Sequence, residues 1–179
     1  FSERGLSDHA EVAISAGSAL GTFENPGELA LMLDYRISHM LVDEMQDTSL
    51  SQYELLQKLT AGWTGDDGRT LFCVGDPMQS IYRFRDAEVG EFLLARQRGI
   101  GNVALEPLQL RRNFRSGENL VHWFNTVFSL IMPLEDDVPV GAISYSASVP
   151  VPQHAGMGEA SVQPLFTADE EAEARQVAG

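Results

Sequence analysis

The hydrophobic pattern of the first half of the chain alternates between short apolar runs and stretches with helical spacing. Residues 37–42 (ISHMLV) and 70–75 (TLFCVG) are apolar on both faces, as are the strands of a parallel sheet covered by helices. A helical pattern with Asn25 as cap and Pro26 at the first position reaches about Arg36. This alternation predicts an α/β fold built on a parallel sheet.

Further elements follow the same spacing rules. A helix capped by Thr48 or Ser49 stops near Gly62, before the turn-rich loop 63–69 (WTGDDGR). The later pattern predicts a helix over 86–99, an extended piece over 103–110, a long amphipathic helix over 116–132 and a loop-rich segment over 133–164 with one or two short strands. In the long helix we predict a core-facing stripe of Leu120, Val121, Phe124, Val127, Phe128 and Ile131.

Composition bounds the class of protein. The 179 residues suffice for one ordinary domain or for two small pieces of a larger protein. The sequence has neither an apolar run long enough to cross a bilayer nor the residue order of a secretory signal, so we expect a cytoplasmic location. A single cysteine, Cys73, excludes a disulfide framework and a thiolate metal cluster, and its apolar neighbours predict a core position.

The ends of the chain predict that it is a piece of a longer protein. It begins with Phe1 rather than Met. Thr167 and Glu170 form a capping box that opens a helix only a few residues before Gly179.

The charge distribution is uneven. A formal net charge of −14 argues against a nucleic-acid partner, because Lys and Arg bind the phosphate backbone. However, residues 83–115 hold seven of the 12 basic residues, all arginines, which suit phosphate and base recognition. The alternative is that these arginines cover ordinary solvated helix faces.

Acidic residues follow both predicted strands. Asp43 and Glu44 come after the first strand and Asp76 after the second, and carboxyl ends of parallel strands share one crevice. One carboxylate there can hold Mg²⁺ with phosphate oxygens, and an adjacent one can orient a water for attack on a phosphoryl group. The alternative is that Asp43 and Glu44 merely cap the next helix.

Three separated blocks resemble known motifs in the order in which they occur. They are HMLVDEMQDTS (39–49), LFCVGDPMQSIYRFRDA (71–87) and LQLRRNFRS (108–116). They resemble motifs II, III and IV of the superfamily 1 DNA helicases of the UvrD/Rep type, with details closer to the RecB/AddA branch. The resemblance implies RecA-like domains of the P-loop NTPase type, the later part of the first over 1–109 and the start of the second over 110–179.

The resemblance implies a role for each matching residue at an ATP site. Asp43 would bind the Mg²⁺ of Mg-ATP, and Glu44 would position or activate the hydrolytic water. Gln79 would sense the γ-phosphate, and Arg115 would reach it from the second domain as an arginine finger. Phe114 falls where the family has an aromatic that stacks on adenine.

The same resemblance implies a DNA contact. Tyr82, Phe84 and Arg85 match residues that stack on or contact single-stranded bases, whereas without it Tyr82 and Phe84 would be predicted as core. Asp47 and Asp76 would tie the motifs together by hydrogen bonds.

The chain departs from the family pattern at three points. Asp86 stands where Gly is common and adds negative charge near the DNA, and Met45 replaces an aromatic or aliphatic residue. No G-x-x-x-x-G-K-[ST] sequence occurs, so we expect the phosphate loop to precede Phe1 and the 179 residues alone to be inactive.

The sequence thus predicts the central part of an ATP-dependent DNA helicase that couples Mg-ATP hydrolysis to movement on single-stranded or partly duplex DNA. Subunits of a repair or recombination complex are further expected partners. The alternatives are the motor subunit of a RecB/AddA-like helicase-nuclease complex, a non-catalytic DNA-binding module with a helicase fold, and a phosphatase or kinase on an α/β sheet.

Overall fold

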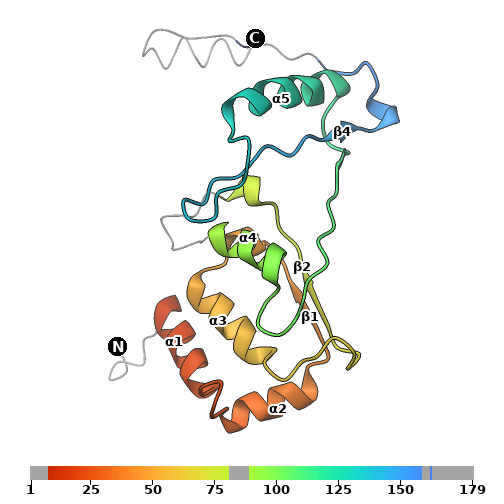
Figure 1. Ribbon diagram of the computed structural model, residues 1–179. Helices are drawn as coiled ribbons and strands as arrows, with labels where there is room; N and C mark the ends of the chain where they lie inside the picture. The colour runs from red at the N-terminus through yellow and green to blue at the C-terminus, as the bar shows by residue number, and fades with distance from the viewer. Residues whose placement is uncertain (1–7, 81–88, 159–161, 163–179) are drawn as a thin grey trace. The chain divides into compact units, whose positions relative to one another are not determined.

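The computed structural model describes residues 8–80, 89–158 and 162. Its contacts divide the chain into two units, one of residues 1–109 with 132–145 and the other of 110–131 with 146–179. Each unit contains one pair of parallel strands within its described residues (Figure 1). The parallel pairing confirms the α/β prediction, while the assignment of both parts to RecA-like domains stays a prediction.

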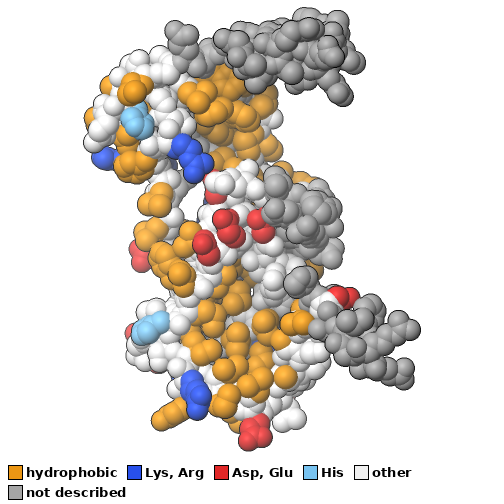
Figure 2. Space-filling view, turned by 180° about the vertical axis from the view of Figure 1, so that it is seen from behind, with side chains coloured by type: hydrophobic (Ala, Val, Ile, Leu, Met, Phe, Trp, Pro, Cys, Tyr) orange, Lys and Arg blue, Asp and Glu red, His pale blue; other side chains and the backbone are white. Residues whose placement is uncertain are grey.

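The sheet of the first unit joins β1 (His39–Val42) to β2 (Thr70–Cys73), in register from His39 opposite Thr70 to Val42 opposite Cys73. The crossover between them contains helix α3 (Leu50–Leu59), as parallel pairing requires. The strands alternate in burial, and Leu41 and Phe72 are 68% and 58% exposed. The prediction of a sheet covered on both faces is therefore wrong for the described chain, because the core lies against one face only. Figure 2 shows many apolar side chains on the surface of this unit.

Three further helices belong to the first unit: α1 (His9–Ala19), which the pattern did not predict, α2 (Glu28–Arg36) and α4 (Val89–Arg98). The predicted cap of α2 was wrong, because Gly27 is the N-cap and Pro26 forms a β-bridge with Gly21. A side chain at Gly27 would place Cβ 2.7 Å from the carbonyl oxygen of Ala19, so only glycine permits this close approach. The predicted cap at Ser49 is confirmed, in a capping box with Gln52.

The core of the first unit lies between the sheet, α3 and α4. Its buried members are Met45, Tyr53, Ala95 and Ile100, against which Val42, Leu56, Leu71, Cys73, Phe92 and Leu105 pack. Removing such side chains from water stabilises the fold by about 1.5–3 kcal/mol for each large one. Burial also raises the pKa of the Tyr53 phenol. Met45 belongs to the turn after β1, so the core fixes the position of that turn.

The second unit pairs β3 (Arg112–Asn113) with β4 (Val149–Pro150) and contains α5 (Glu118–Ile131). The predicted long helix is confirmed, and Val121 is fully buried. Trp123 and Phe124 meet edge to face at 5.4 Å between ring centroids. Ile131 was wrongly predicted as core, because it ends the helix and is 67% exposed.

The remaining predictions concern segments outside the main helices and strands. The predicted extended piece over 103–110 contains no strand, and Leu108 and Leu110 are 79% and 98% exposed. The loop after α3 is confirmed. The capping box at Thr167 and Glu170 lies outside the described residues. No helix within the described part of the chain has both the length and the apolar character needed to span a membrane.

The core position of Cys73 gives a test of the fold. Burial raises the pKa of its thiol from 9.0 to about 11. Since the thiolate is the reactive form, we expect the folded protein at about pH 8 to alkylate roughly 100-fold more slowly than the urea-unfolded protein, with a rate that rises toward pH 11. Equal alkylation rates in the two states, measured by mass spectrometry, would contradict this packing.

Candidate functional site

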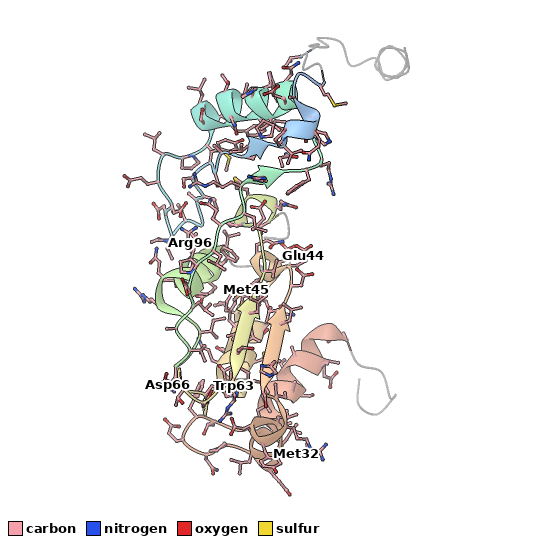
Figure 3. All side chains as sticks on the ribbon, turned by 90° about the vertical axis from the view of Figure 1, so that its right-hand side faces the viewer. Met32, Glu44, Met45, Trp63, Asp66 and Arg96 are labelled. Carbon is pink, nitrogen blue, oxygen red and sulfur yellow. The ribbon has the colours of Figure 1, made fainter. Side chains whose placement is uncertain are left out.

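The ends of β1 and β2 form one edge, where the acidic residues gather. Beyond Val42 the backbone pairing continues, because the Val74 N–H donates to the Val42 carbonyl at 2.8 Å and the Met45 N–H donates to the Val74 carbonyl at 2.9 Å. Figure 3 shows Glu44 and Met45 at this end of the strands and Trp63 near the other end. The two segments that follow the strands are therefore held side by side.

Asp43 and Glu44 begin the turn after β1, and both are exposed. Asp43 Oδ1 accepts a hydrogen bond from the Glu44 N–H at 2.9 Å. Glu44 has φ of 51°, the one positive value of a non-glycine residue in the part of the chain that the structure describes. This left-handed conformation costs about 1–2 kcal/mol, and such strained residues tend to cluster at functional sites. Neither residue caps α3, whose N-cap is Ser49, so that alternative is wrong.

The side chain of Gln46 makes hydrogen bonds to residues after both strands, a role that the sequence pattern did not predict. Its side chain lies in the turn η2 (Met45–Asp47) and is buried, with 2% of the residue exposed. Nε2 donates to Glu44 Oε2 at 2.7 Å and to Asp47 Oδ2 at 3.3 Å. Oε1 accepts from the Asp76 N–H at 3.0 Å. The buried amide thus joins the segment after β1 to the segment after β2, and a glutamine between two acids was the signal that could have revealed it.

Asp76 and Gln79 continue the network after β2. Asp76 caps the turn η3 (Pro77–Gln79), with Oδ1 accepting from the Met78 N–H at 3.0 Å. Its Oδ2 accepts from Gln79 Nε2 at 2.7 Å. Ser80 Oγ donates to the Gln46 carbonyl at 3.3 Å, so Gln46 holds both ends of this turn. The structure therefore brings Glu44, Asp47, Asp76 and Gln79 into one hydrogen-bonded group, with Asp43 adjoining it.

The predicted residues of the second unit lie in a turn of their own. Asn113 Oδ1 accepts from the N–H groups of Arg115 and Ser116, each at 2.9 Å, which fixes the chain after β3. Phe114 is 71% exposed and Arg115 is also exposed. Asn113 presents both side chains outward and is a second supporting residue that sequence reasoning missed. Tyr82, Phe84 and Arg85 lie outside the described residues.

The carboxylates of the first unit suit a cation such as Mg²⁺, which takes most of its ligands from water and phosphate. Within the described ranges, no group of three or more His, Cys, Asp or Glu side chains could enclose a metal ion. Mg²⁺ needs only one or two protein carboxylates beside water and phosphate oxygens, and exposed Asp43 offers one. Asp47 Oδ1 is buried and has no hydrogen-bond partner among the residues that the structure describes.

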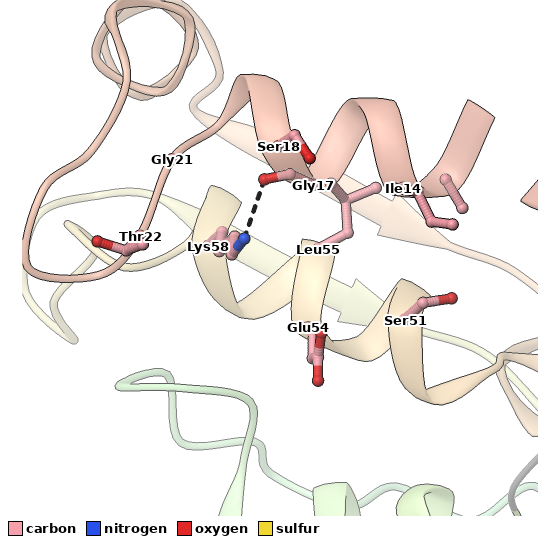
Figure 4. A pocket seen from close by; sticks show the side chains of 10 residues that line it. Ile14, Gly17, Ser18, Gly21, Thr22, Ser51, Glu54, Leu55 and Lys58 are labelled. Atoms are coloured by element: carbon pink, nitrogen blue, oxygen red, sulfur yellow. Dashed lines mark hydrogen bonds between the residues drawn. The ribbon is translucent and has the colours of Figure 1, made fainter. Parts of the chain in front are cut away.

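A hollow between α1 and α3 is a separate feature. Figure 4 shows it with Lys58, whose Nζ donates to the Gly17 carbonyl at 2.9 Å. Ile14 and Leu55 also line it, but none of the predicted site residues does. The hollow is thus separate from the group of acidic residues at the ends of β1 and β2.

Comparison with known proteins identifies the family. Residues 1–99 match the UvrD/REP helicase N-terminal domain. An ATP-dependent helicase/nuclease subunit of Bacillus cereus (strain B4264) is 38% identical over 127 residues, covering 69% of this chain and 10% of the relative. Proteins of the same name from Exiguobacterium sibiricum and Pelotomaculum thermopropionicum are 34% and 36% identical, covering 80% and 77% of this chain and 12% and 11% of the relatives.

The chain therefore spans only about a tenth of the length of the curated relatives it matches. The match to the family covers more than half of the chain, and it includes β1, β2 and the network around Gln46. This match shows that the chain belongs to the UvrD/REP helicase N-terminal domain family.

Proposed function

We propose that this chain forms the centre of an ATP-dependent DNA helicase or translocase, carrying part of the nucleotide site and part of the DNA contact. The observation that carries the proposal is the hydrogen-bonded group of Glu44, Gln46, Asp76 and Gln79 at the carboxyl ends of two parallel strands. This is the place where open α/β sheets bind ligands. Membership of a helicase family supports the same function.

Each residue of the first unit has a task that its surroundings support. Asp43 supplies a carboxylate for Mg²⁺, and bound Mg-ATP would provide the phosphoryl group together with the positive charge that polarises it. Glu44 orients a water molecule and holds its proton at the carboxylate. Gln79, exposed at the end of η3, donates toward the γ-phosphate.

The second unit supplies an arginine and an aromatic ring. Arg115 stabilises the charge that develops on the transferred phosphoryl group, as a planar guanidinium is suited to do. Phe114 offers a largely exposed ring face for stacking on adenine. Tyr82, Phe84 and Arg85 contact single-stranded DNA, which aromatic side chains bind without strong sequence preference.

A second candidate function is more specific than a general helicase. The relatives that are 34–38% identical are named as subunits of an ATP-dependent helicase/nuclease, which favours the motor subunit of a helicase-nuclease complex. Such a complex would make partner subunits of a repair or recombination assembly the partners of this chain. A nuclease domain elsewhere in the full-length protein would decide between the candidates.

Substituting Glu44 by Gln in the full-length protein tests the proposed chemistry. The amide cannot accept the proton of the water, so we expect DNA-stimulated ATP turnover to fall at least about 100-fold while DNA binding persists. Glu54→Gln on the exposed face of α3 is the matched control and should keep full turnover. Normal turnover in Glu44→Gln would refute the role, and DNA binding without any turnover in the unsubstituted protein would favour the non-catalytic module.

Arg115→Ala tests the contribution of the second unit. Loss of the guanidinium should lower the turnover number for ATP by about 1,000-fold, with the folded structure unchanged because the side chain is exposed. Arg36→Ala, at the exposed end of α2, should have no such effect. Steady-state ATPase kinetics distinguish the two outcomes, and equal turnover in both variants would exclude Arg115 from the reaction.

The double substitution Phe84→Ala with Arg85→Ala tests the DNA contact. Since stacking on aromatics contributes about 1–3 kcal/mol for each base, we expect weaker binding of single-stranded DNA and slower translocation. Phe23→Ala, at an exposed phenylalanine of the first unit, is the control. Translocation at the normal rate in the double variant, followed by a fluorescent DNA-end assay, would rule out this contact.

A further inference from the structure

Gln46 connects residues that the proposed reaction uses but has no assigned task of its own. We infer that Gln46 is a positioning residue that holds the Glu44 carboxylate and the Pro77–Gln79 turn in one fixed arrangement. The inference rests on the function proposed above and adds a residue to it. It follows from the geometry of one side chain, which belongs to a residue only 2% exposed and uses both donor directions and its acceptor.

The hydrogen bonds form a continuous path between two functional groups. The path runs from Glu44 Oε2 to Gln46 Nε2, from Gln46 Oε1 to the Asp76 N–H, and from Asp76 Oδ2 to Gln79 Nε2. Each heavy-atom distance lies between 2.7 and 3.0 Å, within the range of well-formed bonds. The path therefore connects the amide proposed to contact the γ-phosphate with the carboxylate proposed to orient the water.

An amide is the one side-chain group that fits this position. Two N–H groups face the carboxylates of Glu44 and Asp47, while a carbonyl oxygen faces the Asp76 N–H. A carboxylate at position 46 would lack both donors, and an apolar side chain would make none of the three hydrogen bonds. The side chain must also be as long as glutamine, because its amide contacts Glu44 after β1 and the Asp76 N–H after β2.

Gly75 gives independent support. A Cβ atom there would lie 2.7 Å from Gln46 Oε1 and 3.0 Å from Phe92 Cε2. The nearest obstacle to a larger residue is thus the terminal oxygen of Gln46, which would have to move away from Asp76. The absence of a side chain at Gly75 keeps room for this amide.

Kinetics of the full-length protein test the inference. Gln46→Met preserves the length but removes the donors and the acceptor, whereas Gln46→Glu preserves length and acceptor and removes the donors. For both we expect the turnover number for ATP to fall about 10- to 100-fold, because a misplaced Glu44 slows only the chemical step. The KM for ATP and the Kd of a non-hydrolysable ATP analogue should stay within about twofold of the unsubstituted values.

A glycine substitution provides a second route that leaves Gln46 itself intact. Gly75→Ala should lower the turnover number in the same way by displacing the amide, with unchanged analogue binding. The matched controls are Gln97→Met, on an exposed position of α4, and Gly65→Ala, where a Cβ atom meets nothing within 4 Å. If Gln46→Met does not fold, the Gly75 and Gly65 pair carries the test.

The outcomes separate this inference from the proposed function. Turnover within about twofold of normal in the Gln46 and Gly75 variants, while Glu44→Gln is inactive, would overturn the positioning role alone. A loss of turnover that merely follows the folded fraction or the loss of analogue binding would also overturn it, since it would show a purely structural role. Undiminished turnover in Glu44→Gln would instead refute the proposed function on which the inference rests.

Discussion

The structure of the turn after β1 depends on the burial of two adjacent side chains, one apolar (Met45) and one polar (Gln46). Met45 must leave water and packs into the core, whereas the buried amide of Gln46 must find hydrogen-bond partners for all its polar atoms. An unpaired buried amide costs about 1–3 kcal/mol, so only a structure that brings Asp76 to the amide satisfies both residues. The contact between the two strand ends follows from this pair of constraints.

The left-handed backbone at Glu44 is a consequence of the same constraints. The chain must turn at Glu44 so that Met45 enters the core and the Asp47 N–H can donate to the Glu44 carbonyl at 2.9 Å. Glycine would adopt this conformation without strain, yet the position holds a carboxylate. The strain of about 1–2 kcal/mol is offset by burial of Met45 and by the bond from Gln46, and the carboxylate is thereby held at the edge of the sheet.

The sequence was sufficient to predict elements whose signals are local. The parallel strands, the cap at Ser49 and the helix of residues 118–131 all follow from short-range patterns, and so does the gathering of acids at the strand ends. The cap of α2 depends instead on the close approach of Gly27 to Ala19, and the exposure of Ile131 depends on where α5 ends. The position of Gln46 between two acids was a signal for a hydrogen-bonding role, but its burial and its contact with Asp76 were not predictable, because Asp76 lies 30 residues away.

The two turns that we predict to contact the nucleotide are both held by uncharged amide side chains. The lack of charge on these amides affects the electrostatics of the site. Gln46 and Gln79 fix the carboxylates of the first unit, and Asn113 fixes the turn that presents Phe114 and Arg115 in the second. An amide specifies geometry as a charged partner would, but it leaves the charge of its neighbours unchanged. The carboxylates at the strand ends are therefore held in place by neutral groups, so a cation such as Mg²⁺, arriving with a nucleotide as proposed above, would add a positive charge that Gln46 and Gln79 do not supply. A lysine in place of Gln46 would instead put a positive charge beside these carboxylates and weaken their attraction for a cation, so the amide at this position is consistent with the proposed Mg-ATP site.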